Sequence, residues 1–490
     1  MDNHTSHQPK TMHTEVVIVG NGPSAISLSY MLAGNRPYYN GHTLSNEYLS
    51  KRLQENMGIS LVEQDLPSLC DGLEGRSNNP VALLFDSLFH PDADLGADNP
   101  PAMDWKYQAE HEVPHVVLGK TKPGGTWQKI DGAMQTISQN SWMELPGVPF
   151  KEWLAKQRHT CRGENMLGRA TISDVKDYYS DYVKSQHLEK YFRDYHTVTS
   201  VQRVFHLRNH VDSESGEVEP CCQNVRRNHT HCWEVRGYST VMDDQGQVVA
   251  RQEFCYVAPH VVLATGAYDI PNRLGVEGEN LPCVVHCLGE FEQRLAQCEA
   301  QTTDPVLVVG AGLSAADAIL MALESNIPVI HVFRRNPNDP SLIFSKLPKA
   351  MYPEYHRVHS LMKGKETNEL YKALPRHSVV EITDGKVLVK AKGTDSLIWF
   401  DISCIAIMIG SRSDLGFLPR EGRHLGVVPK WPIDSKHNTI DIDAYSYQSV
   451  HEPQMFALGP LVGDNFVRFG IGGALGIVSH ISNCRKKDGM

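Results

Sequence analysis

Two stretches constrain the fold more than any others, because each joins a short apolar run to a glycine-rich turn and then to a helix-forming segment. The first is VVIVGNGPSA at residues 16–25, and the second is VLVVGAGLSA at residues 306–315. The apolar run suits a strand buried on both faces, and the glycines permit a sharp turn and a close approach of the backbone to a phosphate. The following helix would direct its partly positive N-terminus at that phosphate. Two such units predict two dinucleotide sites.

Composition excludes several other classes of protein. The chain has 490 residues, of which 41% are hydrophobic and 21% charged, and its formal net charge of -10 gives no support to nucleic-acid binding. The eleven cysteines form no CxxC motif, and the one adjacent pair is Cys221 and Cys222, so we expect neither a zinc site nor a redox dithiol. No apolar run reaches the roughly 20 residues of a membrane span. We expect a soluble cytoplasmic protein without a metal site.

The first unit contains a long insertion. After a helix that ends near Gly34, residues 36–113 combine helical stretches such as Glu47 to Glu55 with turn-rich pieces, and a buried strand resumes at His115 to Leu118. Within the insertion, LEGRSNNPVALLFDSLFHP is apolar enough to pack on the rest of the unit. The insertion could serve as a lid, an anchor or a surface for protein partners.

The turn after that strand carries a more specific pattern. It reads KTKPGGTW and places Gly124, Gly125, Thr126 and Trp127 directly after the strand. A strand with a GG[T/A]W loop, downstream of a GxGxxG strand, resembles the flavin-containing monooxygenases and their Baeyer–Villiger and N-hydroxylating relatives. The resemblance implies that this loop borders FAD and that Trp127 helps to cover the flavin. A Gly-Gly turn with a tryptophan in the core is the alternative.

One position departs from that pattern. The relatives carry a glutamate at the end of this strand, where it binds the hydroxyls of the adenosine ribose, whereas the present chain has Gly119. We therefore expect another residue to substitute for the acid, or FAD to bind more weakly than in the relatives.

Further segments resemble flavin-contacting parts of the relatives. In MQTISQNSWMELP, the side-chain amides of Gln135, Gln139 and Asn140 are candidates for contact with the flavin, with Gln139 and Asn140 as the candidate catalytic residues; amides that cap their own turn are the alternative. The remaining candidates for FAD binding lie in the first glycine loop, in a strand that passes the adenine, in an ATG turn, in the turn after strand 403–411 and in a C-terminal loop: Gly20, Gly22, Pro23, Ser24, Ala25, Val201, Ala264, Thr265, Gly266, Gly410, Gly459, Gly463 and Asp464.

An amphipathic helix is expected within residues 169–188, capped by Thr171 or Ser173, with its tyrosines in the core. A β-meander with a variable loop is expected from His210 to Gln252.

The second unit favours NADPH over NADH. Its candidate residues are Gly310, Gly312, Ser314 and Ala315, and its next strand, PVIHVF, ends in Arg334 and Arg335. An NAD site uses a carboxylate at the end of this strand, whereas the 2′-phosphate of NADP needs cations. Two surface arginines on a solvated strand end are the alternative.

The predicted fold is α/β, with a Rossmann-type FAD domain into which an NADPH-binding Rossmann domain is inserted. We expect residues 1–14 to be disordered, residues 15–268 and 403–490 to form the FAD-binding domain, and residues 269–402 to form the NADPH-binding domain.

The stretches VGNGPS, LEGRSNNPVALLFD, PHVVLGK, LPKAMYPEYH and GPLVGDNFVRF together resemble the oxidative stress induced growth inhibitor family over most of the chain, including the insertion. The resemblance implies an FAD- and NADPH-dependent monooxygenase that acts through a flavin C4a-hydroperoxide on dioxygen and an unknown substrate, either a small molecule or a protein side chain. It also implies roles in growth control, differentiation and cytokinesis, and it allows an association with the midbody.

Three alternatives remain open at this stage. A disulfide or quinone reductase also carries two dinucleotide units, although a disulfide reductase needs a cysteine pair that the chain lacks. An uncoupled NADPH oxidase that releases hydrogen peroxide would use the same binding residues. A non-catalytic scaffold that keeps the fold is the third.

Overall fold

The computed structural model describes residues 10–130, 132, 134–157, 168–207, 229–243, 247–298 and 304–487. The chain forms two compact units, one made of residues 1–267 and 413–490 and the other of residues 268–412. Cys221 and Cys222, the first nine residues and most of the variable loop lie outside the described residues.

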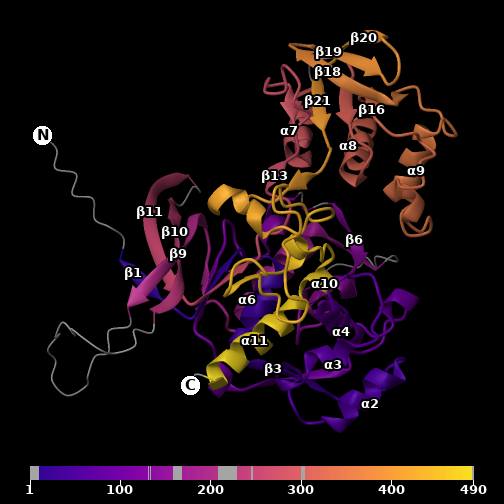
Figure 1. Ribbon diagram of the computed structural model, residues 1–490. Coiled ribbons are helices and arrows are strands. Elements are labelled where there is room, and N and C mark those ends of the chain that lie inside the picture. The colour runs from indigo at the N-terminus through magenta and orange to yellow at the C-terminus, as the bar shows by residue number, and fades with distance from the viewer. Residues whose placement is uncertain are drawn as a thin grey trace, which may run out of the picture. The chain divides into compact units, whose positions relative to one another are not determined.

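A parallel sheet forms the centre of the first unit (Figure 1). Its strands occur in the order β23-β12-β2-β5-β8, and their bounds are Met455–Ala457, His260–Leu263, Val16–Val19, His115–Leu118 and Phe192–Arg193. Val16 of β2 pairs with His115 on one side and with His260 on the other. Each residue of β2 is at most 4% exposed, which confirms the predicted buried strand.

Helices and irregular segments surround this sheet. They include α1 (Pro23–Leu32), α5 (Phe150–Gln157), α6 (Ile172–Ser185), α10 (Val467–Gly470) and α11 (Gly473–Lys487). The short 3-10 helices of the chain are η1 (Leu61–Glu63), η2 (Ala93–Leu95), η3 (Ala109–His111), η4 (Gly125–Lys129), η5 (Asn140–Met143), η6 (Ile343–Lys346), η7 (Pro419–Leu425) and η8 (Gly459–Val462).

Helix α6 is capped at its N-terminus by Thr171, one of the two residues predicted for this role. The Thr171 hydroxyl accepts a hydrogen bond from the Asp174 N–H, and the Asp174 carboxylate accepts one from the Thr171 N–H. The cap is therefore Thr171 and not Ser173, because this reciprocal pair satisfies two donors that the helix start leaves open. The three tyrosines of the helix are buried, as predicted, and each donates its hydroxyl proton to a backbone carbonyl: Tyr178, Tyr179 and Tyr182.

The insertion is an ordered part of the first unit. It contains β3 (Asn35–Tyr39), α2 (Glu47–Glu55), α3 (Leu66–Cys70), α4 (Pro80–Phe89) and β4 (Met103–Tyr107), and β3 and β4 pair antiparallel. Leu84 and Phe85 of α4 are fully buried in the same hydrophobic core as Val16. The expectation that this apolar segment packs on the unit is therefore confirmed.

The N-terminal prediction needs a correction. Residues 1–14 were expected to be disordered, but Thr11–His13 form β1, which pairs parallel with β11 (Val248–Ala258). This strand is held by backbone hydrogen bonds while its side chains stay exposed, so no hydrophobic pattern indicates it. An antiparallel meander is present as β9 (His196–Leu207), β10 (His229–Met242) and β11, so it begins before and ends after the range of residues 210–252 that was expected to hold it. The short strands β6 (Gln135–Gln139) and β7 (Arg169–Thr171) pair separately.

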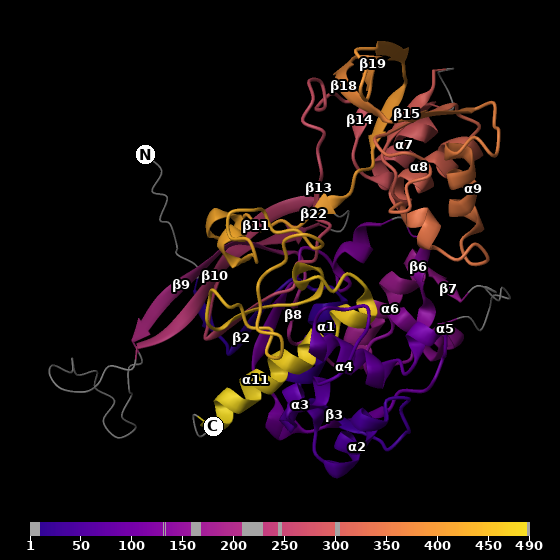
Figure 2. The same ribbon diagram turned by 45° about the vertical axis from the view of Figure 1, so that its right-hand side comes forward.

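The second unit has its own parallel sheet, seen from another side in Figure 2. The strand order is β14-β21-β15-β16-β17, with the bounds Val284–Val285, Cys404–Ile407, Val306–Val309, Val329–Phe333 and Tyr371–Pro375. Three helices accompany this sheet: α7 (Leu288–Cys298), α8 (Leu313–Glu324) and α9 (Pro353–Met362). A separate antiparallel sheet contains β18 (His377–Thr383), β19 (Lys386–Ala391) and β20 (Leu397–Asp401). Strands β13 (Ile270–Pro271) and β22 (Ser411–Arg412) pair with each other.

The second unit extends further than the sequence indicated. Strand β21 was expected to lie in the FAD-binding part, from residue 403 onward, but it pairs with β14 and β15 of the second unit. Its four residues are buried in that sheet, and the chain leaves the unit after Arg412.

Candidate functional site

The glycine loop after β2 has the geometry of a phosphate-binding turn. Gly20 has a φ of +110°, and a Cβ there would lie 2.3 Å from the carbonyl oxygen of Ala264, so only glycine fits. Gly22 caps α1 without any side-chain hydrogen bond, and a Cβ at Gly22 would meet no atom within 4 Å. The loop therefore leaves open space beside the unsatisfied N–H groups of a helix start.

The predicted GGTW loop lies against this turn. The Gly124 N–H donates to the Asn21 carbonyl over 2.9 Å, and a Cβ on Gly125 would come within 3.1 Å of the Gly22 Cα. Both Gly124 and Gly125 have positive φ angles. The structure thus brings together two glycine segments that lie about a hundred residues apart.

Two more predicted segments reach the same place. A Cβ on Gly459 would lie 2.7 Å from the Ser24 hydroxyl oxygen, so the C-terminal loop packs on the start of α1. Thr265 follows Ala264, and its hydroxyl oxygen is buried with no hydrogen-bond partner among the described residues. Space at Gly22, donors at the start of α1 and this hydroxyl fit the diphosphate of a dinucleotide.

Asp464 occupies a different environment from the one the sequence suggested. It is 3% exposed, and its carboxylate accepts hydrogen bonds from Ser77 (2.6 Å), Asn79 (2.8 Å) and Tyr447 (3.3 Å). Burial raises its pKa to about 7, although these hydrogen bonds oppose the shift. The carboxyl group joins the insertion to the C-terminal loop. A direct role of Asp464 in FAD binding stays a prediction.

The candidate amides lie on β6 and η5. Gln135 is exposed, whereas the side-chain oxygen of Asn140 is buried without a hydrogen-bond partner in the described part of the chain. The Asn140 N–H donates to the Gly168 carbonyl, which anchors the backbone at this residue. Asn140 is therefore the amide with an unsatisfied acceptor. The roles predicted for Gln135, Gln139 and Asn140 stay predictions.

The other candidates in the first unit are placed as follows. Trp127 is half-buried and packs on the main core, Thr126 is half-buried on η4, Val201 is fully buried on β9, and Gly463 has a φ of +92°.

Sequence reasoning missed two features of this unit. The first is that the Asn21 side chain covers Gly119. The sequence signal for this contact is the pairing of a glycine at the expected acid position with an asparagine between Gly20 and Gly22. Arg468 is 1% exposed and binds Asp86 (2.7 Å) and Asp94 (2.9 Å) of the insertion, and no sequence signal connects residues so far apart.

The second unit contains a matching glycine loop. A Cβ on Gly310, whose φ is +136°, would lie 2.3 Å from the Met408 carbonyl oxygen, and a Cβ on Gly312 would meet nothing within 4 Å. Gly312 caps α8 without a side-chain hydrogen bond, Ser314 is exposed and Ala315 is buried. The open glycine beside a free helix start repeats the arrangement at Gly22.

A buried histidine holds this loop. Nε2 of His331 lies 2.6 Å from the Gly310 carbonyl oxygen, and Nδ1 lies 2.7 Å from the Tyr371 hydroxyl. Burial lowers the pKa of His331 to about 4, so the ring is neutral near pH 7. Because a carbonyl only accepts, Nε2 carries the proton and Nδ1 accepts from Tyr371.

The two predicted arginines differ in their contacts. Both are exposed after β16, and Arg335 donates to the Ser341 hydroxyl over 2.6 Å. Arg334 forms no ion pair within the described residues, so its guanidinium is available to a ligand. Gly410, with a φ of +84°, is exposed near Asn272.

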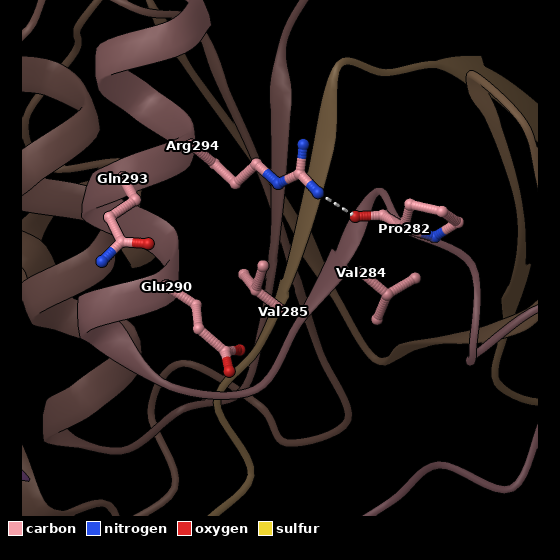
Figure 3. A pocket seen from close by; sticks show the side chains of 6 residues that line it. All are labelled: Pro282, Val284, Val285, Glu290, Gln293 and Arg294. Atoms are coloured by element: carbon pink, nitrogen blue, oxygen red, sulfur yellow. Dashed lines mark hydrogen bonds between the residues drawn. The ribbon is translucent and has the colours of Figure 1, made fainter. Parts of the chain in front are cut away.

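A hollow of about 390 Å³ lies beside β14 and α7, and Figure 3 shows its lining. Arg294 donates to the Pro282 carbonyl over 2.6 Å, and Glu290 accepts a long hydrogen bond (3.4 Å) from the His286 N–H. These side chains satisfy backbone groups at the edge of the sheet, and the hollow belongs to that edge.

The described residues contain neither a cluster of metal ligands nor a membrane-spanning helix. No group of three or more His, Cys, Asp or Glu residues there is arranged to hold a metal ion. No helix in that part of the chain is long and apolar enough to cross a membrane.

Fold and geometry together define a protein of two Rossmann-type units, each with the open glycine loop of a dinucleotide-binding site. A family model described as pyridine nucleotide-disulphide oxidoreductase matches residues 234–427.

Human oxidative stress-induced growth inhibitor 2 is 44% identical over 96% of this chain and 94% of its own length. Human oxidative stress-induced growth inhibitor 1 is 42% identical over 95% and 94%. The chain belongs to the oxidative stress-induced growth inhibitor family.

Two solved structures share the fold at low sequence identity. Bacillithiol disulfide reductase from Bacillus cereus is 17% identical, with a TM-score of 0.56 over 96% of this chain and all of that one. Reduced ornithine hydroxylase from Pseudomonas aeruginosa is 13% identical, with a TM-score of 0.53 over 96% and 98%. Each likeness concerns the fold alone.

Proposed function

We propose that the protein is a flavin-dependent NADPH monooxygenase, with FAD in the first unit and NADPH in the second. The observation that carries this proposal is the convergence of four segments at the open start of α1. Gly22, Gly125, Ala264 and Gly459 come from distant parts of the chain and meet within van der Waals distance of the same turn or helix start. The open position at Gly22 lies where these segments meet, beside the N–H groups at the start of α1.

The chain's own groups have distinct tasks in this proposal. The N–H groups at the start of α1 bind the FAD diphosphate, and the Thr265 hydroxyl supplies a further polar contact. The Asn140 side-chain oxygen accepts a hydrogen bond from the bound cofactor. Trp127 and its neighbours exclude water from one side of the site. When bound, FAD supplies the acceptance of hydride and the activation of dioxygen.

Selection of NADPH is assigned to the second unit. The open start of α8 at Gly312 binds the diphosphate, and His331 keeps the loop in place through Gly310. Arg334 pairs with the 2′-phosphate, because a guanidinium without another ion pair presents its donors to a dianion. Arg335 adds positive charge while it donates to Ser341.

The monooxygenase is favoured over a disulfide reductase by the cysteine pattern of the sequence. The eleven cysteines form no CxxC motif, and a disulfide reductase needs a redox thiol pair. Ornithine hydroxylase has a likeness in fold comparable to that of the bacillithiol disulfide reductase, so the fold does not separate the two reactions. The lack of a CxxC motif favours reaction with dioxygen.

Growth control is proposed as the cellular role because the human relatives are named growth inhibitors. Differentiation, cytokinesis and a cytoplasmic or midbody location are kept as proposals that rest on the resemblance alone. The substrate is proposed to be a small molecule or a protein side chain.

Spectroscopy of the purified protein tests the proposal. We expect a yellow preparation whose flavin absorbance is bleached under anaerobic conditions faster by NADPH than by NADH. A colourless protein that cannot be reconstituted with FAD would contradict the proposal. If flavin binds, the fraction of NADPH electrons recovered as hydrogen peroxide separates coupled oxygenation from an NADPH oxidase.

A further inference from the structure

A groove in the first unit is lined by three segments that are distant in sequence. Residues 64–67 at the start of α3, the loop of residues 443–446 and the part of α11 between residues 476 and 483 enclose a volume of about 240 Å³. Figures 1 and 2 both place α3 close to α11. None of the predicted cofactor residues lines this groove, so the groove is separate from the site described above.

The loop of residues 443–446 is held rigidly against α11. A Cβ on Gly476 would lie 2.3 Å from the Tyr445 carbonyl oxygen, so the helix and the loop touch at this glycine. Asp443 stabilises the loop, because its Oδ1 accepts from the Tyr445 N–H (3.2 Å), the Ser446 N–H (2.8 Å) and the Ser446 hydroxyl (2.7 Å). Oδ2 of Asp443 takes part in none of these bonds.

Asp443 carries a negative charge at neutral pH. Burial opposes the charged form, but the hydrogen bonds from Ser446 and Tyr445 outweigh burial and hold the pKa of Asp443 below its usual value. His480 of α11 lies near enough to favour the carboxylate further. The groove therefore has an ionised oxygen on one wall.

Gln64, from the segment before α3, provides a second acceptor. Its side chain lines the groove and is 9% exposed, and its Nε2 donates to the Ile59 carbonyl over 2.8 Å. Its Oε1 is buried and has no hydrogen-bond partner among the residues that the structure describes. An unmade hydrogen bond at a buried oxygen is costly, so a donor from a ligand would be stabilising there.

Asp65 provides a third acceptor, because only one of its two carboxylate oxygens is used by a neighbouring backbone N–H, as in Asp443. Its Oδ1 caps α3 by accepting from the Ser68 N–H over 3.3 Å. The groove thus offers one amide oxygen and one oxygen from each of two carboxylates, and Leu66, Pro67 and Tyr445 line it beside these polar groups.

We propose that this groove binds an alkylammonium group, either of a lysine side chain or of a free aliphatic amine. An ammonium group has three donors that point in different directions, which suits three separate oxygens. A guanidinium prefers both oxygens of one carboxylate, and here each carboxylate has already committed Oδ1 to its own backbone turn. The apolar side chains accommodate the methylene groups of the ligand.

Calorimetry on the full-length protein tests this site with three probes: 1,4-diaminobutane, N-acetyl-lysine methylamide and the Nε-acetylated form of that amide. We expect saturable binding of at least one of the two amines and none of the acetylated compound. The amine that binds more tightly identifies the source of the ammonium group. Binding should weaken as salt is added, because the attraction is between charges.

Variants locate the binding in the groove. Asp65→Asn combined with Asp443→Asn keeps both caps, because asparagine oxygens accept the same N–H groups, and it should weaken binding by about tenfold or more. Gln64→Met removes the Oε1 acceptor at nearly the same side-chain length and should weaken amine binding, whereas a merely structural role for Gln64 would change only the melting temperature. Asp71→Asn is the matched control, since Asp71 follows α3 and pairs with Arg52 outside the groove.

Three results would overturn the proposal: no saturable binding of either amine, equal binding of the acetylated probe, or equal affinities of the double variant and the wild type. Unchanged melting temperatures of the variants show that any loss of binding is not a loss of fold.

Discussion

The side chain of Asn21 lies directly on Gly119. A Cβ at Gly119 would come within 2.0 Å of the Asn21 Nδ2 and 2.1 Å of its Cγ, so any larger residue at this position requires the Asn21 side chain to move. Asn21 is 3% exposed, and its Nδ2 donates to the Thr121 carbonyl over 2.7 Å. A neutral amide therefore occupies the space at the end of β5, where the resemblance to flavin-containing monooxygenases predicts an acid.

This contact predicts that Gly119→Glu alone is harmful. The new Cβ would displace Asn21 and break its hydrogen bond to Thr121, and overpacking of this kind typically costs about 1–3 kcal/mol. We expect a lower melting temperature and less flavin per chain. Asn21→Gly combined with Gly119→Glu removes the clash and restores the carboxylate, so it should bind FAD at least as tightly as the wild type.

The two single variants and the double variant form a cycle that measures the coupling between the positions. Asn21→Gly alone serves as the control for loss of the amide. If Gly119→Glu alone has the wild-type flavin content and melting temperature, the two side chains do not compete for this space.

The open position at Gly22 predicts a second effect. Gly22→Asp adds a carboxylate where the FAD diphosphate is proposed to bind, and like charges at that distance repel each other strongly. Because a Cβ at Gly22 meets no protein atom and the φ of -74° suits any residue, the fold should tolerate the change. We expect loss of flavin from a protein with a normal melting temperature, measured by absorbance.

Gly289→Asp is the matched control for this variant. Gly289 also has open space around a Cβ and lies at the start of a helix, but it belongs to α7 of the second unit. Normal flavin content in Gly22→Asp, or equal flavin loss in Gly289→Asp, would refute the site.

Local patterns in the sequence were sufficient for the elements that position the site. The bounds of β5 follow from the apolar run HVVL, and the sequence narrowed the cap of α6 to Thr171 or Ser173, of which the structure shows Thr171. The glycine loops at Gly20 and Gly310 were recognisable because a strand, a turn and a helix are contiguous in the chain. Each of these features depends on neighbours within a few residues.

Contacts between distant segments could not be predicted in this way. Asp464 meets Ser77 and Asn79 across more than 380 residues, and Arg468 meets Asp86 across a similar distance. A single sequence contains no signal that pairs such positions, because the pairing arises only when the insertion packs against the C-terminal helices. Strand β1 was missed for a related reason, since its partner β11 follows more than 230 residues later.

Arg335 donates to Ser341, whereas Arg334 is proposed to bind the 2′-phosphate of NADPH, so Arg334 should determine the preference for NADPH over NADH. Arg334→Ala should raise the KM for NADPH by about tenfold while leaving the KM for NADH nearly unchanged, because a charge-assisted hydrogen bond contributes about 1.5–3 kcal/mol. Steady-state reduction of the flavin with each coenzyme measures this. Arg357→Ala is the control for a general loss of positive charge, because Arg357 lies on α9 and pairs with Glu366. Equal effects on both coenzymes would contradict a 2′-phosphate contact at Arg334.

The buried carboxyl group of Asp464 predicts an unusual dependence of stability on pH. Burial raises its pKa to about 7, whereas an aspartate in the unfolded chain titrates near 4. Between these two values the folded state binds more protons than the unfolded state, so this group makes the protein less stable as the pH rises from 4 to 7.

Asp464→Asn removes that titration and keeps the shape, and the amide can rotate so that its oxygen accepts from Asn79 and Tyr447 while its NH₂ faces Ser77. Relative to the wild type, the variant should therefore gain stability between pH 5 and pH 8, by about 3 kcal/mol. Melting temperatures of both proteins across this range measure the difference. The exposed Asp395→Asn variant should show no such trend. Parallel melting curves for Asp464→Asn and the wild type would mean that Asp464 is already ionised at pH 5.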